Sequence, residues 1–130
     1  MAVAQEAAAA AAEREDGEVA KETQSPEELK ARGNELYRGQ DVQGAVELWN
    51  LALRAHVEAM MPGGPGPSPL SEESQALERS LYLNLAQGYL RLGQPERTLR
   101  ACEVVIRDHR GDAKATYRKA EACLALKRFD

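Results

Sequence analysis

Apolar and polar residues alternate at three- and four-residue spacing from residue 25 onward, which is the pattern of amphipathic helices. The stretch SPEELKARGNELYRGQ opens the series. Ser25 is a favourable N-cap, Pro26 suits the first helical position, and Glu28 completes a capping box. The apolar face of this stretch consists of Leu29, Gly33, Leu36 and Tyr37. The pattern therefore predicts a helix that begins after Ser25 and is interrupted at Gly39-Gln40.

A second helix is predicted through residues 41–61, where the apolar positions again recur every three or four residues. Trp49 lies on this apolar face, so we expect it in the core. The segment PGGPGPSP at 62–69 follows. It can form neither a helix nor a paired strand, because proline lacks the backbone N–H that both need. We expect a loop there.

Three further helices are predicted, at about 71–91, at about 95–109, and from near Ala113 onward. Gly93 and Pro95 mark the first boundary between them, and Asp112 is the expected N-cap of the last helix. Turns this short place consecutive helices antiparallel to each other. The chain is therefore expected to be all-α.

The helices also repeat. Ala86 in YLNLAQGYL and Ala120 in TYRKAEACL occupy equivalent places at an offset of 34, and Gly33 precedes Ala86 by 53, the excess being the proline- and glycine-rich loop and its flanks. Helix–turn–helix units with this shorter period are the signature of tetratricopeptide repeats (TPR). We therefore predict a TPR helical-hairpin solenoid with two full repeats and the first helix of a third. The predicted boundaries are a disordered Ala/Glu-rich tail at 1–24, repeat 1 at about 26–61, a loop at 62–70, repeat 2 at about 71–110 and a partial repeat 3 at 113–130.

The third repeat stops at its turn, so its second helix is absent from this sequence. A helix pair buries its apolar stripe against its mate. The sequence is therefore typical of a shortened form of a longer repeat protein, with an exposed apolar strip on its last helix. The residues expected on that strip are Tyr117, Cys123, Leu124 and Phe129.

Charge and composition exclude several classes of function. The net charge of −4 comes entirely from residues 1–24, and residues 25–130 carry equal numbers of acids and bases. A nucleic-acid binder would need a basic patch, so no nucleic acid is expected. No apolar run approaches the ~20 residues of a membrane span, and the short run Ala7–Ala12 is flanked by acids, unlike a signal peptide. We expect a protein of the reducing cytoplasm, and of the nucleus as well, with no membrane partner.

At LKARGNELYRGQDVQGAVELW, LYLNLAQGYLRLGQPE and DAKATYRKAEACLAL the chain resembles the TPR domains of co-chaperones that bind the C-terminal Glu-Glu-Val-Asp tail of Hsp90- and Hsp70-type chaperones. The insertion between the first two repeats is most similar to the TPR regions of FKBP-type immunophilins and their aryl-hydrocarbon-receptor-interacting relatives. That class binds the tail through a "carboxylate clamp" of five side chains. The resemblance assigns the clamp to Lys30, Asn34, Asn84, Lys114 and Arg118.

The residue types fit that task. A peptide that ends in Asp presents two carboxylates on one residue, and their oxygens accept hydrogen bonds without donating any. Lys30 and Lys114 supply ammonium groups, Arg118 supplies a planar fork, and Asn34 and Asn84 donate N–H groups without adding charge. The resemblance thus implies a co-chaperone or adaptor that binds chaperone tails and, through them, client proteins.

Other interpretations stay open for these residues. Lys114 and Arg118, taken alone, are typical of a solvated helix face. Asn34 alone is compatible with an ordinary helix surface. Asn84 lies within the apolar run LYLNLA, where a structural hydrogen bond to a neighbouring repeat would serve equally well. The alternative function is therefore a general TPR scaffold that binds another peptide or helix in its groove.

No enzyme is expected. The sequence has no phosphate loop, no metal-ligand spacing, no cofactor motif and no catalytic triad, and only the low-complexity segment 1–24 precedes Ser25, too short for a prolyl isomerase domain. We expect His56 and His109 to be structural. Cys102 and Cys123 fall at packing positions of the repeats and are expected to be buried thiols.

Overall fold

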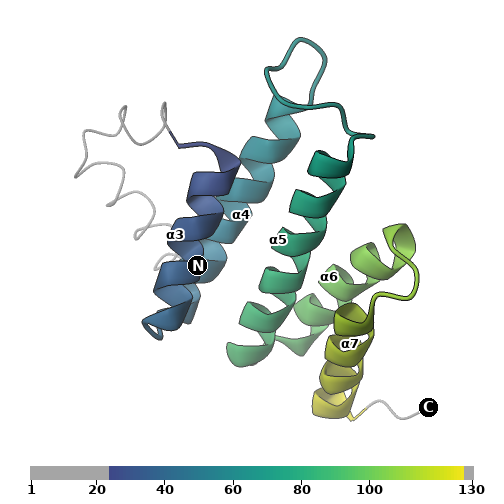
Figure 1. The fold of residues 1–130 in the computed structure, drawn as a ribbon. Coiled ribbons are helices and arrows are strands. Elements are labelled where there is room, and N and C mark those ends of the chain that lie inside the picture. The colour runs from purple at the N-terminus through teal and green to yellow at the C-terminus, as the bar shows by residue number, and fades with distance from the viewer. Residues whose placement is uncertain (1–23, 128–130) are drawn as a thin grey trace.

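The computed structural model describes residues 24–127, which form five α-helices and no strand (Figure 1). The helices are α3 (Pro26–Arg38), α4 (Val42–Ala59), α5 (Glu72–Arg91), α6 (Pro95–Asp108) and α7 (Ala113–Leu126). The predicted all-α, TPR-like helical-hairpin fold is confirmed for this part of the chain. Two predictions concern residues outside this range: the disordered tail at 1–24, of which only Gln24 is described, and the exposed Phe129.

The helix starts follow the sequence signals. The Ser25 hydroxyl accepts from the Glu28 N–H at 3.1 Å, and the Glu28 carboxylate accepts from the Ser25 N–H at 2.9 Å, which is the predicted capping box. Asp112 caps α7 by accepting from the Ala115 N–H at 2.9 Å. Each cap satisfies backbone donors that have no partner within the helix.

The first helix of each repeat ends with the same backbone feature. Gln40, Gly93 and Lys127 follow α3, α5 and α7, and they have positive φ angles of 75°, 77° and 58°. Their numbers differ by 53 and 34, the same offsets that relate Gly33, Ala86 and Ala120. Glycine adopts this left-handed conformation readily, whereas Gln40 and Lys127 adopt it at a cost of about 1–2 kcal/mol. The repeat is therefore present in the backbone as well as in the sequence.

The helices form two layers. α3, α5 and α7 lie side by side toward the viewer in Figure 1, with α4 and α6 behind them. Both α3 and α7 contact α5, whereas α4 and α6 do not contact each other in the described chain. The first helices of the repeats, α3, α5 and α7, therefore lie closer to one another than α4 and α6 do, which makes their side the inner, concave face.

Small residues let the paired helices approach. A Cβ on Gly33 would lie 2.6 Å from the Trp49 indole nitrogen, so only glycine fits beneath that ring. Trp49 is 3% exposed, as predicted for a core residue. At the equivalent place in the second repeat, Ala86 is fully buried and its carbonyl accepts from the Thr98 hydroxyl at 2.8 Å. These contacts fix the angle of each hairpin.

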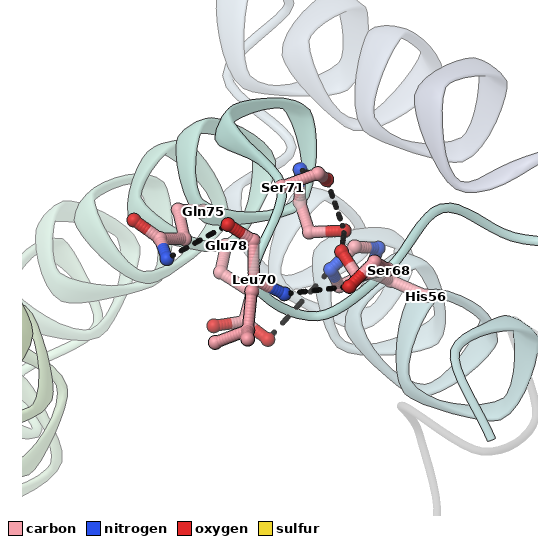
Figure 2. A network of polar contacts seen from close by, with 7 residues as sticks. His56, Ser68, Leu70, Ser71, Gln75 and Glu78 are labelled. Atoms are coloured by element: carbon pink, nitrogen blue, oxygen red, sulfur yellow. Dashed lines mark hydrogen bonds and ion pairs between the residues drawn. The ribbon is translucent and has the colours of Figure 1, made fainter. Parts of the chain in front are cut away.

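The loop between the repeats is tied to α4 by the Gly66 N–H, which donates to the Ala59 carbonyl at 2.8 Å, and to α5 by the contacts of Ser68 (Figure 2). Ser74, which is buried, donates from its hydroxyl to the Ser68 carbonyl at 2.7 Å, and the Ser68 hydroxyl accepts from the Leu70 N–H. Beneath them, His56 on α4 is 2% exposed, and its Nε2 lies 3.7 Å from a carboxylate oxygen of Glu78 on α5. His56 thus lies at a packed junction of two helices.

α7 packs against α6 and presents its outer side to solvent. Tyr117 and Leu124 are 62% and 63% exposed, which confirms the predicted apolar strip at these two positions. Cys102 is buried as predicted, but Cys123 is only half-buried. The prediction of a buried thiol is wrong at Cys123 because no helix covers that side of α7 in the described chain.

Candidate functional site in the groove between the first helices

Two of the five predicted site residues are in direct contact. Asn84 on α5 donates from Nδ2 to Oδ1 of Asn34 on α3 at 3.2 Å, and the same oxygen accepts from the Trp49 indole N–H at 3.1 Å. The indole N–H also lies 3.3 Å from the Lys30 carbonyl. One tryptophan therefore joins α4 to two turns of α3, and one asparagine pair joins α3 to α5.

These bonds fix which way the Asn34 amide points. An indole nitrogen can only donate, so the Asn34 atom that faces it must be the carbonyl oxygen. The Asn34 NH₂ group is consequently turned away from Trp49, and it forms no hydrogen bond within the described residues. Asn34 is thus an oriented donor at the surface of the groove.

A hollow of about 260 Å³ lies beside this pair. Its lining comes from Asn34, Tyr37, Arg38, Trp49, Asn84 and Gln87. The Tyr37 ring is held by Arg91, whose guanidinium lies 5.2 Å from the ring centre and donates to the phenol oxygen at 3.1 Å. The wall of the hollow contributed by α3 is thereby braced from α5. The hollow offers polar and aromatic contacts suited to an extended peptide.

The α7 part of the site repeats this arrangement with a cation. Arg118 follows Asn84 at an offset of 34, and Cys102 follows Trp49 by 53, so Arg118 beside Cys102 is the counterpart of Asn84 beside Trp49. Burial raises the pKa of the Cys102 thiol to about 11, and the nearby positive charges of Arg118 and Lys119 act in the opposite direction. Cys102 is therefore a protonated packing residue at neutral pH.

The Arg118 side chain is 22% exposed, and its terminal nitrogen lies 3.7 Å from Glu121 one turn away. Its Nε atom is buried and has no hydrogen-bond partner in the described chain. A guanidinium has five N–H donors. Arg118 therefore has donor capacity left for an anion.

The two lysines lie further out. Lys30 is half-buried on α3, one turn before Asn34, and Lys114 is exposed on α7, one turn before Arg118. Within the described residues, no hydrogen bond or ion pair links the side chains of Lys30, Lys114 or Arg118 to the Asn34–Asn84 pair. The structure thus brings the two asparagines together, and it places Lys30 on α3 and Lys114 and Arg118 on α7 without a bond to that pair.

Sequence reasoning missed the role of Trp49 in orienting Asn34, because we assigned that residue to the core alone. A signal was present, since Gly33 beside Asn34 leaves room for the indole edge to reach the Asn34 side chain. Asn84 was expected to need a partner, and Asn34 is that partner. The structural hydrogen bond weighed as an alternative for Asn84 is therefore real.

Other kinds of site receive no support from residues 24–127. No group of three or more His, Cys, Asp or Glu side chains there is placed to hold a metal ion. None of the helices in this range combines the length and the apolar character needed to cross a bilayer.

Comparisons with known proteins give one set of relatives. No family model matches the chain. The human protein named FK506-binding protein-like is 36% identical over 100 residues, which cover 76% of this chain and 25% of that protein. The mouse and rat proteins of the same name are 36% and 35% identical over 107 and 113 residues, and these cover 82% and 86% of this chain. The chain spans about a quarter of the length of these relatives. The name of these proteins is compatible with the resemblance to FKBP-type immunophilins, and the helical-hairpin fold of this chain is compatible with it as well.

Proposed function

We propose that this chain is an adaptor module that binds the C-terminal Glu-Glu-Val-Asp tail of Hsp90- or Hsp70-type chaperones on its concave face, without enzymatic activity of its own. The observation that carries the proposal is the Asn34–Trp49–Asn84 arrangement, which turns an unpaired amide donor into the groove. Lys30, Lys114 and Arg118 supply the charges around it.

The chemistry assigns a role to the three cations and to Asn34, which Asn84 holds in place. The final Asp of the tail brings two carboxylates, which Lys30, Lys114 and Arg118 neutralise, while the Asn34 amide donates to the peptide. A charge-assisted hydrogen bond contributes roughly 1.5–3 kcal/mol, and the ordering of the tail and the desolvation of its carboxylates oppose that gain. An affinity on the order of micromolar, about −8 kcal/mol, is the expected net result.

A second candidate function is a general helical-repeat scaffold that binds another extended peptide. The hollow beside Asn34 and Tyr37 favours this scaffold function, because Arg38 is the one charged residue among those that line the hollow. On this alternative the cations on α7 are a solvated face and the terminal carboxylate contributes nothing.

A peptide titration separates the two functions. A fluorescent peptide ending in Glu-Glu-Val-Asp with a free terminus is compared with its C-terminal amide by anisotropy at low and moderate salt. The clamp predicts tighter binding of the free acid and a marked loss of affinity with added salt, because exposed charges are screened. Equal affinities for acid and amide would instead support the scaffold.

Two substitutions test the residues themselves. Lys30→Ala and Arg118→Ala should each weaken binding by at least about 1 kcal/mol, which is roughly fivefold. Lys127→Ala removes an exposed lysine that follows α7 and lies outside the five predicted positions, so it is the matched control and should change little. A circular dichroism melt of each variant separates a lost contact from a lost fold. Equal effects of all three would refute the assignment.

A further inference from the structure

A second groove lies on the opposite face of the molecule, between α4 and α6. These two helices pack on α5 from either side but do not contact each other in the described chain, so part of α5 forms a floor between them. The groove encloses about 220 Å³. In Figure 1, α4 and α6 lie in the layer behind α3, α5 and α7. None of the residues that line this groove also lines the hollow beside Asn34 and Asn84.

The floor is aromatic and apolar and is held in place. It is formed by Tyr82, Leu85 and Tyr89, which are spaced along one side of α5. The Tyr89 phenol oxygen accepts from the Asn50 amide on α4 at 3.1 Å, and the Arg97 guanidinium on α6 lies 5.5 Å from the Tyr89 ring centre. Both walls thus fix the same ring, so the groove is largely formed before any ligand arrives.

The two walls differ in charge. The α6 wall presents Arg97 and Arg100, both exposed, and the α4 wall presents Leu53 with Asn50. One turn beyond Leu53, Val57 is 44% exposed and extends the apolar side. No acidic side chain is among the residues that line the groove. A ligand that fits this surface is apolar beneath and negatively charged along one flank.

We propose that this groove binds a short amphipathic helix of a partner protein, with its apolar side chains against the half-buried Leu53 and Tyr82 and its carboxylates toward Arg97 and Arg100. A helix satisfies its own backbone hydrogen bonds, and the walls, being helices themselves, offer no strand edge to which an extended peptide could pair. Apolar anchors give the affinity, and the arginines set the orientation and the sign of the partner's charge.

The test uses the whole chain and two synthetic helical peptides of about 15 residues, or roughly four turns. Both carry Leu at three- and four-residue spacing, and one flank is Glu in the first and Lys in the second. The Glu peptide should bind at least about tenfold tighter than the Lys peptide in a low-salt anisotropy titration. A third peptide with the Leu and Glu positions scrambled should bind as weakly as the Lys peptide.

Charge reversal gives the decisive arm. Arg100→Glu, which leaves the Arg97–Tyr89 contact in place, should lower the affinity for the Glu peptide at least about fivefold and raise the affinity for the Lys peptide. Arg32→Glu on α3 makes the same change of charge on a helix that does not contact α6, and should alter neither. Rescue of the Lys peptide cannot come from a misfolded variant, so this arm stays informative.

The result also separates this groove from the proposed clamp. Arg118→Ala should leave the Glu peptide unaffected, and Arg100→Glu should leave the chaperone-tail peptide unaffected. The proposal is overturned if the Glu and Lys peptides bind with equal affinity, or if Arg118→Ala abolishes binding of the Glu peptide. It is also overturned if sedimentation shows that a second copy of the chain already fills the groove.

Discussion

α5 and α7 occupy the same place in successive repeats, yet they differ in how much of their surface is covered. α5 contacts α4 on one side and α6 on the other, and Leu81, Leu85 and Ala86 are almost fully buried. α7 packs mainly on α6, contacts α5 more lightly, and leaves Tyr117 and Leu124 exposed. The same sequence pattern therefore gives a core helix in one place and a surface helix in the other, and the difference is a neighbour.

This difference divides the candidate site into two parts. The α3–α5 part is braced by Trp49, which orients Asn34. The α7 part carries Lys114 and Arg118 on the helix with the least support. Segments with few buried apolar contacts open at lower free energy than core segments. We therefore expect the α3–α5 part to be preformed and the α7 part to move more readily.

The largest expected difference between α5 and α7 is in the cost of truncating one leucine in each helix. Leu81→Ala on α5 empties a fully buried position, and it should lower the free energy of unfolding by roughly 2–5 kcal/mol. Leu124→Ala on α7 removes a side chain that is largely exposed. The free energy of unfolding should then change only within about ±0.5 kcal/mol, as is usual for surface substitutions. Urea unfolding followed by circular dichroism measures both. Comparable losses would mean that α7 is covered in solution.

A second pair of substitutions adds volume at equivalent small residues. Ala86→Leu places a large side chain against Ala101 and Cys102, and it should destabilise the fold by roughly 1–3 kcal/mol. Ala120→Leu makes the same change at the matching place in the next repeat, which is exposed. It should be tolerated within about ±0.5 kcal/mol. A large loss at Ala120 in the same urea titration would show that the two helices are more alike than their exposures imply.

The comparison also shows what sequence could predict. Caps, turns and the offsets of 34 and 53 are local or periodic signals, so the helices near Ser25, Gly93 and Asp112 and their antiparallel order followed from them. The exposure of Tyr117 and Leu124 also agrees with the sequence-based expectation of an apolar strip on α7.

Signals that depend on three helices at once were not readable. Gly33 indicated that the Trp49 indole could reach Asn34, but no spacing along the chain states that Asn84 on α5 meets the same Asn34 oxygen. The groove between α4 and α6 was missed for the same reason, since it exists where two helices fail to touch.

A smaller effect is expected from pH at the junction of α5 and α7. The Asp112 side chain is 4% exposed, and although burial favours the neutral acid, hydrogen bonds from the Ala115 N–H and from Arg79 on α5 hold its pKa below the ordinary value. A lowered pKa in the folded state means that this stabilisation is present above about pH 4 and is lost as the pH falls through the folded value.

Asp112→Asn keeps an N-cap residue but loses the charge, so it should cost about 1 kcal/mol at pH 7 and less at about pH 3. Asp41→Asn is the matched control, because Asp41 caps α4 and forms no ion pair in the described chain. Urea unfolding at both pH values checks this. A cost for Asp112→Asn that is the same at both would remove the Arg79 contact as its cause.

An effect at least as large as that of Asp112→Asn should come from Trp49→Phe, which keeps an aromatic ring over Gly33 but removes the indole N–H. The loss of the bonds to Asn34 and Lys30, together with the smaller ring at a buried position, should cost at least about 1 kcal/mol. Tyr37→Phe, the control, removes the hydroxyl that accepts a solvent-exposed hydrogen bond from Arg91. Its cost should stay within about 0.5 kcal/mol. Because Asn84 can still donate to Asn34, the fold of the Trp49 variant should persist while the amide loses its fixed orientation. Two-dimensional NMR of the Asn34 side-chain amide, together with the tail-peptide titration, measures this. If that resonance and the affinity stay unchanged, Asn34 is held by α5 alone, and the rigidity of the α3–α5 part does not come from Trp49.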